Sequence, residues 1–129
     1  MPLLSLTGSV DRAAVTEAGL LETIADLYVD RMDSKRSFLS VTYDELPRES
    51  VLLGRADTGA PVLLLEADVR RGRPVDQRRE FAVAAMDAAR EALALPRENL
   101  KVVFTEHEGP HLMGYDRVGG EWESDGANS

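Results

Sequence analysis

The chain has 129 residues, and its acidic side chains outnumber its basic ones to give a formal net charge of −8. This balance argues against nucleic acid or an anionic membrane as a partner, and the lack of any cysteine excludes disulfides and thiol chemistry. With 43% hydrophobic residues, no apolar run long enough to span a membrane and no expected signal peptide, the sequence predicts one cytoplasmic domain over residues 1–129.

The first half of the sequence predicts a strand, a helix and a second strand. Residues 2–7 read as an apolar strand, and a helix is expected from a cap at Asp11 to about Met32. The second strand spans residues 38–45, and a short extra strand spans residues 51–53. Spacings of three and four residues place one apolar face on the helix, made of Leu20, Leu21, Ile24, Leu27 and Tyr28.

The second half predicts the same order of elements. Residues 61–67 read as a strand, Pro74 suits the first turn of a helix, and Pro96 ends that helix. Residues 100–106 form the last main strand, and the Gly-, Ser- and Asn-rich residues 119–129 read as a mobile tail. The apolar stripe of this second helix is predicted to be Phe81, Ala85, Ala88, Ala92 and Leu95.

The two halves are copies of one unit, residues 2–58 and residues 59–118. The opening Pro2-Leu3-Leu4-Ser5-Leu6 recurs as Pro61-Val62-Leu63-Leu64-Leu65, about 60 residues later, and the second strands also align. Each strand–helix–strand unit implies a parallel strand pair with a right-handed crossover. The sequence therefore predicts an α+β fold, an α/β sandwich in which a tandem β-α-β repeat forms a four-stranded mixed sheet, with two helices on one face and short hairpin strands.

The strand over residues 61–67 is apolar at both alternating sets of positions. Because two helices cover only one face of a sheet, we expect the other face to be apolar as well and to be buried in a homo-oligomer.

The densest basic cluster of this acidic chain is Arg70, Arg71 and Arg73, after a predicted strand and before a helix. Helix starts attract anions, and arginine binds a carboxylate through two parallel hydrogen bonds. The alternative is a solvated loop in which these arginines pair with nearby carboxylates such as Asp68. Both readings stay open from the sequence.

Pro2 directly follows Met1, so removal of Met1 would leave a secondary amine that takes a proton or attacks a carbonyl. A free α-amino group has a pKa of roughly 7.7–8.0, and burial or adjacent arginines lower it. His107 and His111 are the two histidines, and we expect them in a solvent-exposed loop. No metal site and no cofactor are expected.

These features together resemble the tautomerase superfamily, and within it the two-unit chains similar to cis-3-chloroacrylic acid dehalogenase. The likeness rests on Pro2 opening a β-α-β unit, on the repeat, on Arg70-Arg71-Gly72-Arg73, and on Met113-Gly114-Tyr115-Asp116-Arg117 followed by Gly120-Glu121-Trp122. It implies that Met1 is removed, that the Pro2 nitrogen is catalytic, and that Arg70 and Arg73 hold a substrate carboxylate. It also implies a homotrimer.

The sequence departs from the dehalogenase pattern at three positions. Tyr28 stands where the resemblance implies a histidine, Val103 where it implies a tyrosine, and Gly114 where it implies a water-activating glutamate. The related malonate semialdehyde decarboxylases have an aspartate near the start of the second strand, where this chain has Arg36-Ser37-Phe38. Neither dehalogenation nor decarboxylation is therefore expected.

The remaining site groups, the Pro2 amine with Arg70 and Arg73, predict keto–enol tautomerisation of a small 2-oxo carboxylic acid, in which Pro2 moves the proton. Two alternatives stay open. One is another activity of the same family, of dehalogenase, hydratase or decarboxylase type, in which Tyr28, Glu45 or Tyr115 supplies a replacement acid or base. The other is a non-catalytic trimer that binds a small carboxylate or another protein.

Overall fold

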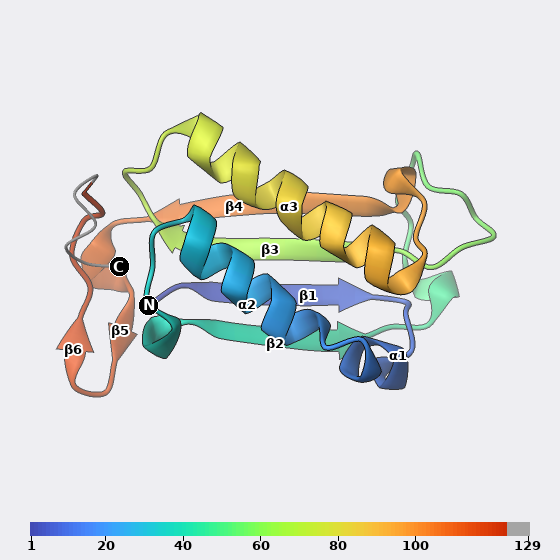
Figure 1. Cartoon of the computed structure of the whole chain (residues 1–129), viewed down its shortest axis with the longest axis horizontal. Coiled ribbons are helices and arrows are strands. Elements are labelled where there is room, and N and C mark those ends of the chain that lie inside the picture. The colour runs from blue at the N-terminus through green and yellow to red at the C-terminus, as the bar shows by residue number, and fades with distance from the viewer. Residues whose placement is uncertain (124–129) are drawn as a thin grey trace.

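The computed structural model describes residues 1–123. Figure 1 shows one sheet with helices packed across it. The first unit consists of β1 (Leu3–Gly8), α1 (Arg12–Glu17), α2 (Leu20–Arg31) and β2 (Ser40–Glu45). The second consists of β3 (Leu63–Arg70), α3 (Val75–Leu93) and β4 (Leu100–His107). A small hairpin of β5 (Met113–Gly114) and β6 (Arg117–Val118) follows.

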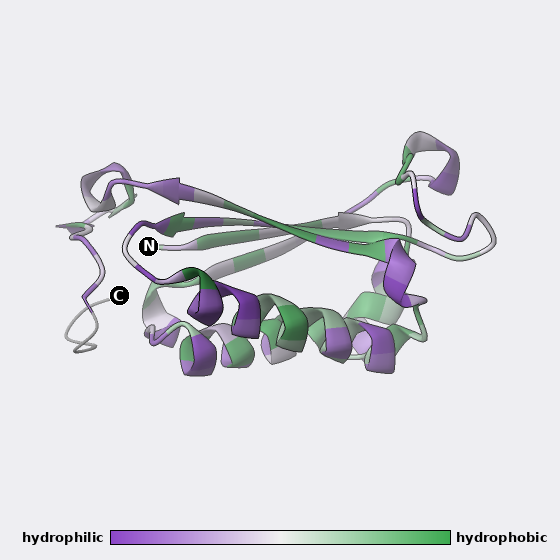
Figure 2. Ribbon diagram, turned by 90° about the horizontal axis from the view of Figure 1, so that it is seen from above, coloured by the Kyte–Doolittle hydropathy of each residue, from purple (hydrophilic) through white to green (hydrophobic). Residues whose placement is uncertain are grey.

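The strands of the sheet lie in the order β2-β1-β3-β4. The pairs β1–β2 and β3–β4 are parallel, as expected within each unit, and the two units join through the antiparallel pair β1–β3. Figure 2 shows α2 and α3 side by side on one face of the sheet, with the other face bare. The predicted fold class is therefore confirmed, including the tandem repeat and the helices on a single face.

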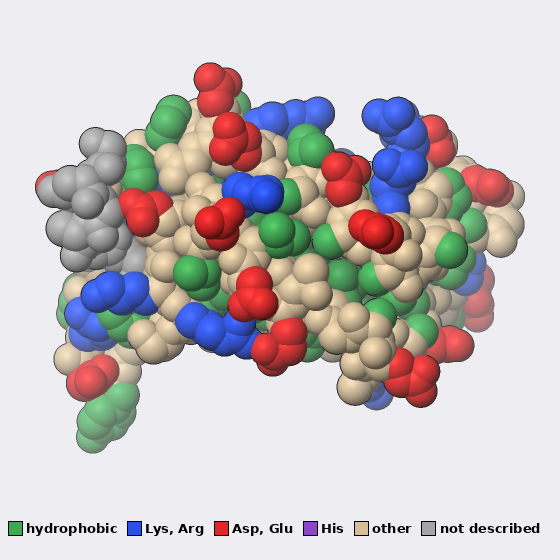
Figure 3. Space-filling model, viewed as in Figure 1, with side chains coloured by type: hydrophobic (Ala, Val, Ile, Leu, Met, Phe, Trp, Pro, Cys, Tyr) green, Lys and Arg blue, Asp and Glu red, His purple; other side chains and the backbone are tan. Residues whose placement is uncertain are grey.

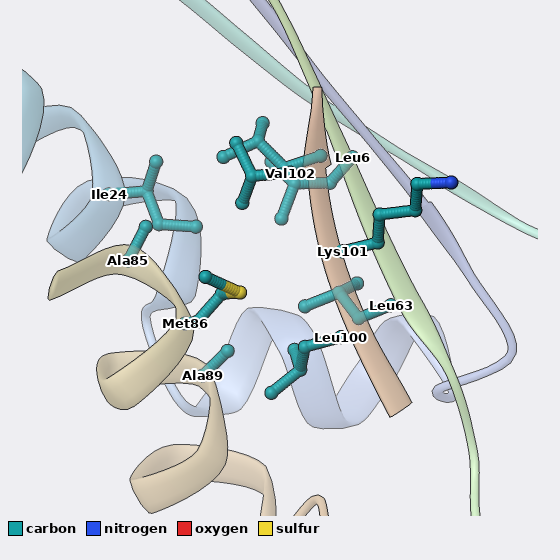
Figure 4. Close-up of a pocket in the computed structure, with 10 residues that line it drawn as sticks. Leu6, Ile24, Leu63, Ala85, Met86, Ala89, Leu100, Lys101 and Val102 are labelled. Carbon is teal, nitrogen blue, oxygen red and sulfur yellow. The ribbon is translucent and has the colours of Figure 1, made fainter. Parts of the chain in front are cut away.

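The core lies between the helices and the sheet. At its centre Tyr28 of α2 meets Phe81 of α3 edge to face, with ring centroids 5.1 Å apart. A void of about 10 Å³ remains between α3 and the sheet, where Ala85, Met86 and Ala89 face the strands (Figure 4). A space of this size holds at most a water molecule, so the core contains no ligand site there.

Several predicted element boundaries are wrong. The first helix breaks into α1 and α2 at Gly19, whose φ of 65° lies in the left-handed region that glycine adopts without a steric penalty. Residues 51–53 form no strand, and the extra hairpin lies at residues 113–118 instead. The strand expected at residues 61–67 is shifted and includes Arg70. On α3 the buried face is Phe81, Ala82, Ala85 and Ala89, while Ala92 is exposed.

The expectation that both sheet faces are apolar is also wrong. Along β3 the side chains of Leu63, Leu65 and Ala67 are buried against the helices, and the alternate residues of the sheet face outward. These outward residues are mostly polar, with Leu3 and Val103 as exposed apolar members. The apolar pattern of residues 61–67 therefore describes one strand only, and the outward residues of the other strands do not share it.

The helix-bearing side of the molecule carries acidic and basic side chains intermixed (Figure 3). Arg36, for example, pairs with both Glu22 and Asp26 across this surface. Within residues 1–123, no helix combines the length and the apolar character needed to cross a membrane.

Candidate active site

The antiparallel register of β1 and β3 places the start of the chain beside the end of β3. Leu3 pairs with Asp68, so two residues further along Met1 lies opposite Arg70. Pro2 is buried, and its carbonyl accepts a hydrogen bond from the backbone of Ser40 at 3.2 Å. The antiparallel strand direction therefore brings Pro2, at the start of β1, close to Arg70, at the end of β3.

The free amine of the described chain belongs to Met1, because the Pro2 nitrogen forms the peptide bond with Met1. The pKa of the Met1 amine is lowered from 8.0 to about 6, first by burial and then by the positive charges of Arg70, Arg117 and Arg73. Arg117, on β6, stacks over the Phe38 ring at 4.1 Å and adds a cation that the arginine cluster did not include. An amine at this place is mostly neutral at pH 7 and can accept a proton.

Arg70 and Arg73 are almost completely buried, with 3% and 4% of their surfaces exposed. Arg70 donates through Nη1 to the carbonyls of Gly120 and Glu121 at 2.8 and 3.2 Å, and Arg73 donates through Nε to the Met32 carbonyl at 2.7 Å. Burial lowers the pKa of both guanidinium groups. These contacts fix the two side chains and leave other N–H groups of each available.

Those remaining donors have no hydrogen-bond partner within residues 1–123: Nε and Nη2 of Arg70, and Nη1 of Arg73. The Tyr28 hydroxyl and the Trp122 Nε1–H also lack a hydrogen-bond partner within residues 1–123. Both rings flank Arg73, whose guanidinium lies 5.8 Å from the centre of the Tyr28 ring and 5.2 Å from the centre of the Trp122 ring. Burial raises the pKa of Tyr28 to about 12, so its hydroxyl stays protonated at neutral pH. Unpaired buried donors cost roughly 1–3 kcal/mol each, more when charged, and a carboxylate is the acceptor that would satisfy them.

Residues 119–123, which the sequence assigned to a mobile tail, contact the arginine cluster. The Glu121 carboxylate accepts the Gly109 N–H at 3.0 Å and bonds Arg71 at 3.2 Å, and the Gly109 bond is the main cause of the lowered pKa of Glu121. A Cβ on Gly72 would lie 2.9 Å from the Trp122 carbonyl oxygen, so this approach requires glycine, which also has φ of 128°. The segment thus covers the arginines; residues 124–129 of the expected tail lie outside the described residues.

An open hollow of about 640 Å³ adjoins the amino end. Met1, Pro2 and Phe38 line it together with the hairpin residue Gly114. A Cβ on Gly114 would lie 2.6 Å from Cε of Met1, so the Met1 side chain rests directly against this glycine. The amino end therefore lies between the arginine cluster that lowers its pKa and an open hollow.

The two histidines, which the sequence placed in a solvent-exposed loop and not in the site, also line this hollow. His107 is the last residue of β4, and not part of a loop as expected; its Nε2 lies 2.8 Å from Oδ1 of Asp68 on β3. His111 lines the same hollow and is exposed, as predicted. Across residues 1–123, no group of three or more His, Asp or Glu side chains is placed to hold a metal ion.

The sequence matches no protein-family model, and no curated protein matches it either. Solved structures do match it. A member of the cis-3-chloroacrylic acid dehalogenase family superposes with a TM-score of 0.79 at 20% identity, over 92% of this chain and 84% of the other. A fused 4-OT symmetric trimer gives a TM-score of 0.75 at 21% identity over 90% and 93%, and macrophage migration inhibitory factor from Toxoplasma gondii gives 0.74 at 18% over 90% and 98%.

The chain has the tautomerase-superfamily fold. Within this fold, Gly114 lies in the hollow beside the amino end, so the position where the resemblance implies a glutamate faces the site and carries no carboxylate. Tyr28 reaches Arg73 and thus lies in the site. Val103 lies mid-strand on the bare sheet face, opposite Glu66, and does not line the hollow.

The other accessory candidates of this tautomerase-fold chain do not reach the site. Glu45 pairs with Gly8 at the far end of β1, about 17 Å along the strand from Leu3, and accepts the Arg12 N–H. Tyr115 is fully exposed at the tip of the β5–β6 hairpin. Of the three, only Tyr28 contacts the arginine cluster, and its position on the buried face of α2 was the sequence signal for a core residue.

Proposed function

We propose that the chain, once Met1 is removed, is a keto–enol tautomerase that acts on small 2-oxo carboxylic acids through the Pro2 amine. The observation that carries this proposal is the pair of buried guanidinium groups with unpartnered donors beside the amino end. A neutral amine next to a carboxylate-binding pocket is the minimal equipment for moving a proton at the carbon beside a carbonyl.

Each group has a separate role in this scheme. Arg70 and Arg73 bind the substrate carboxylate and stabilise the negative charge that develops on the neighbouring oxygen. The Pro2 nitrogen takes a proton from C3 of the 2-oxo acid, and the electron pair of the broken C–H bond forms the C=C bond of the enol. In the simplest version, the same ammonium then gives the proton to the oxygen. Tyr28 and Trp122 supply neutral donors at the edge of the pocket.

The removal of Met1 decides between this function and a second candidate. Met1 packs against Gly114 and occupies part of the hollow, and with Met1 present the Pro2 nitrogen is an amide without basicity. A chain that keeps Met1 retains the arginine pocket, so it would bind a small carboxylate without catalysing tautomerisation. We infer in either case a homotrimer as the working form.

The test is ketonisation of the enol of phenylpyruvate, followed by absorbance, with two preparations that mass spectrometry shows to lack or to keep Met1. We expect activity above buffer only for the preparation without Met1. Pro2→Ala retains a primary amine and should keep part of that activity. A Met1-free preparation that does not accelerate the reaction, yet binds 2-oxo acids, would establish the non-catalytic binder instead.

A further inference from the structure

We propose that His107, held by Asp68, is a second catalytic acid–base group, which serves the oxygen end of the substrate while Pro2 serves the carbon end. This inference rests on the proposed tautomerase function and names a residue pair for it. The two side chains come from neighbouring parallel strands, and their polar atoms lie 2.8 Å apart.

The position of the pair follows from the sheet. Asp68 is the register partner of Leu3, the residue after Pro2, and His107 is the register partner of Arg70, two residues further along β3. Leu63, Leu65 and Ala67 of β3 are buried against the helices, so the alternate residue Asp68 projects on the bare face, and so does His107, which bonds Asp68 from the neighbouring strand. There they line the same hollow as Met1 and Pro2.

Both side chains of the pair are partly accessible, since each is 31% exposed. They are buried enough for a strong mutual hydrogen bond, and open enough for contact with a ligand in the hollow. The other residues of this face are mostly Ser, Thr and charged residues, so the pair does not belong to the apolar core of the chain.

The hydrogen bond assigns a state to the imidazole. An ionised Asp68 accepts from His107 Nε2–H, which leaves Nδ1 as the nitrogen that can exchange a proton with a ligand. Asp68 is therefore a positioning residue, and Nδ1 of His107 is the reactive atom.

The proton transfers balance in this arrangement. Towards the enol, the neutral Pro2 nitrogen takes the C3 proton, the C–H electron pair becomes the C=C bond, and the carbonyl π pair moves to oxygen. The oxygen then takes the proton from Nδ1 of the His107 imidazolium, which leaves neutral imidazole bonded to Asp68. Ketonisation is the reverse, and the two groups return to their starting states by proton exchange with solvent in the open hollow.

The experiment compares three variants of the Met1-free protein in the phenylenolpyruvate assay: His107→Ala, Asp68→Asn and the control Glu80→Gln. General acid–base groups contribute typically 10²-fold or more. We expect kcat to fall about 100-fold in H107A with KM changed little, to fall less in D68N, and to stay within about twofold in E80Q. Glu80 is exposed on α3 and does not line the hollow, so E80Q controls for the loss of one carboxylate charge, as in D68N, away from the site.

Two readouts separate catalysis from a structural role. Free imidazole should restore activity to H107A, because the hollow is large enough to admit it, and should do nothing for D68N. In ¹⁵N spectra of the wild-type ring, Nε2 should carry the bonded proton, and D68N should change that signal. D68N is nearly isosteric, so it tests the pair even where H107A folds poorly.

The outcomes are distinct. Wild-type activity together with H107A or D68N activity within about twofold of it would overturn the role of the pair and leave the proposed function standing. A loss in H107A that imidazole does not rescue would likewise show that His107 only supports the structure. A Met1-free wild type without tautomerase activity would overturn both proposals together.

Discussion

Leu3 and Asp68 are register partners in the antiparallel strand pair β1–β3. This pairing sets the beginning of one unit against the end of the other unit's first strand. It brings Pro2 close both to the arginine cluster and to the Asp68–His107 pair. If β1 and β3 had been parallel, Pro2 and the residues at the end of β3 would lie at opposite ends of the sheet.

Replacing Arg73 by alanine should lower kcat/KM for the 2-oxo acid by about tenfold to a hundredfold. The variant removes a charged hydrogen-bond donor, whose loss costs roughly 1.5–3 kcal/mol. It also frees the Met32 carbonyl, which Arg73 now bonds at 2.7 Å, so the melting temperature should fall as well. Arg79→Ala, on the exposed surface of α3, is the matched control and should change neither quantity. Equal activity of R73A and wild type would contradict the carboxylate-binding role.

The amino end should titrate well below an ordinary α-amino group. In the chain with Met1 its pKa of about 6 is set by burial, Arg70, Arg117 and Arg73, so Arg117→Ala should raise it. The pH dependence of acylation of the amine measures it. Because folding lowers the pKa of a cationic group, stability is highest when the amine is neutral and falls as the pH drops from about 8 towards 6.

The Pro2 amine of the Met1-free chain lies in the same field. In the direction of enolisation, where the neutral Pro2 nitrogen takes the C3 proton, the acid limb of the kcat/KM profile should therefore fall below the ordinary range of roughly 7.7–8.0 for a free amine. An acid limb within that range would show that the arginines do not act on the Pro2 nitrogen.

The chain should release little or no chloride from the 3-chloroacrylate isomers. Hydration needs a base for water, and Gly114 provides none at the position that faces the amino end. In the Met1-free protein a side chain fits here, because the atoms closest to a Cβ belong to Met1. Gly114→Glu is then the variant with the best prospect of gaining chloride release, and Gly114→Gln is its uncharged control. Chloride release by the wild type at the rate of a dedicated dehalogenase would refute the argument.

The order and direction of the elements followed from the sequence because the repeat is visible in it. Apolar periodicity identified α2 and α3, and the repeated strand–helix–strand order gave the two parallel pairs. The helix break at Gly19 was missed because a single glycine is tolerated within many helices, and its positive φ is a tertiary outcome.

The candidate site was predicted only in part, for a physical reason. Pro2, Arg70 and Arg73 stand out because their chemistry is unusual in this chain. The contributions of Trp122, Arg117 and the Asp68–His107 pair depend on which strands are neighbours and on how residues 109–123 fold back. The one local signal was the pair Gly109 and Gly119, since glycines permit the close backbone approach that this segment makes.

The protein should form a homotrimer in solution, and light scattering should give about three times the chain mass of 14.1 kDa. The support is a bare sheet face that exposes Leu3 and Val103 and two uncovered edge strands, β2 and β4, which natural proteins usually pair or cover. Val103→Asp should weaken the assembly, while Val75→Asp, an exposed valine on α3, should not. A monomer at micromolar concentration would rule the trimer out.

Trp122 should report ligand binding directly, because it is the single tryptophan of the chain and its ring lies 5.2 Å from the Arg73 guanidinium. A carboxylate drawn to the free donors of Arg73 changes the field at the indole, so titration with pyruvate should shift or quench the fluorescence in a saturable way. Arg73→Ala should abolish this response, and Arg79→Ala should preserve it. Trp122→Phe keeps an aromatic face for the cation but removes the buried, unpartnered Nε1–H, so it should raise KM several-fold with little change in melting temperature. If pyruvate protects the protein against heat yet leaves the fluorescence unchanged, the ligand binds away from Arg73, and the assignment of the carboxylate pocket fails.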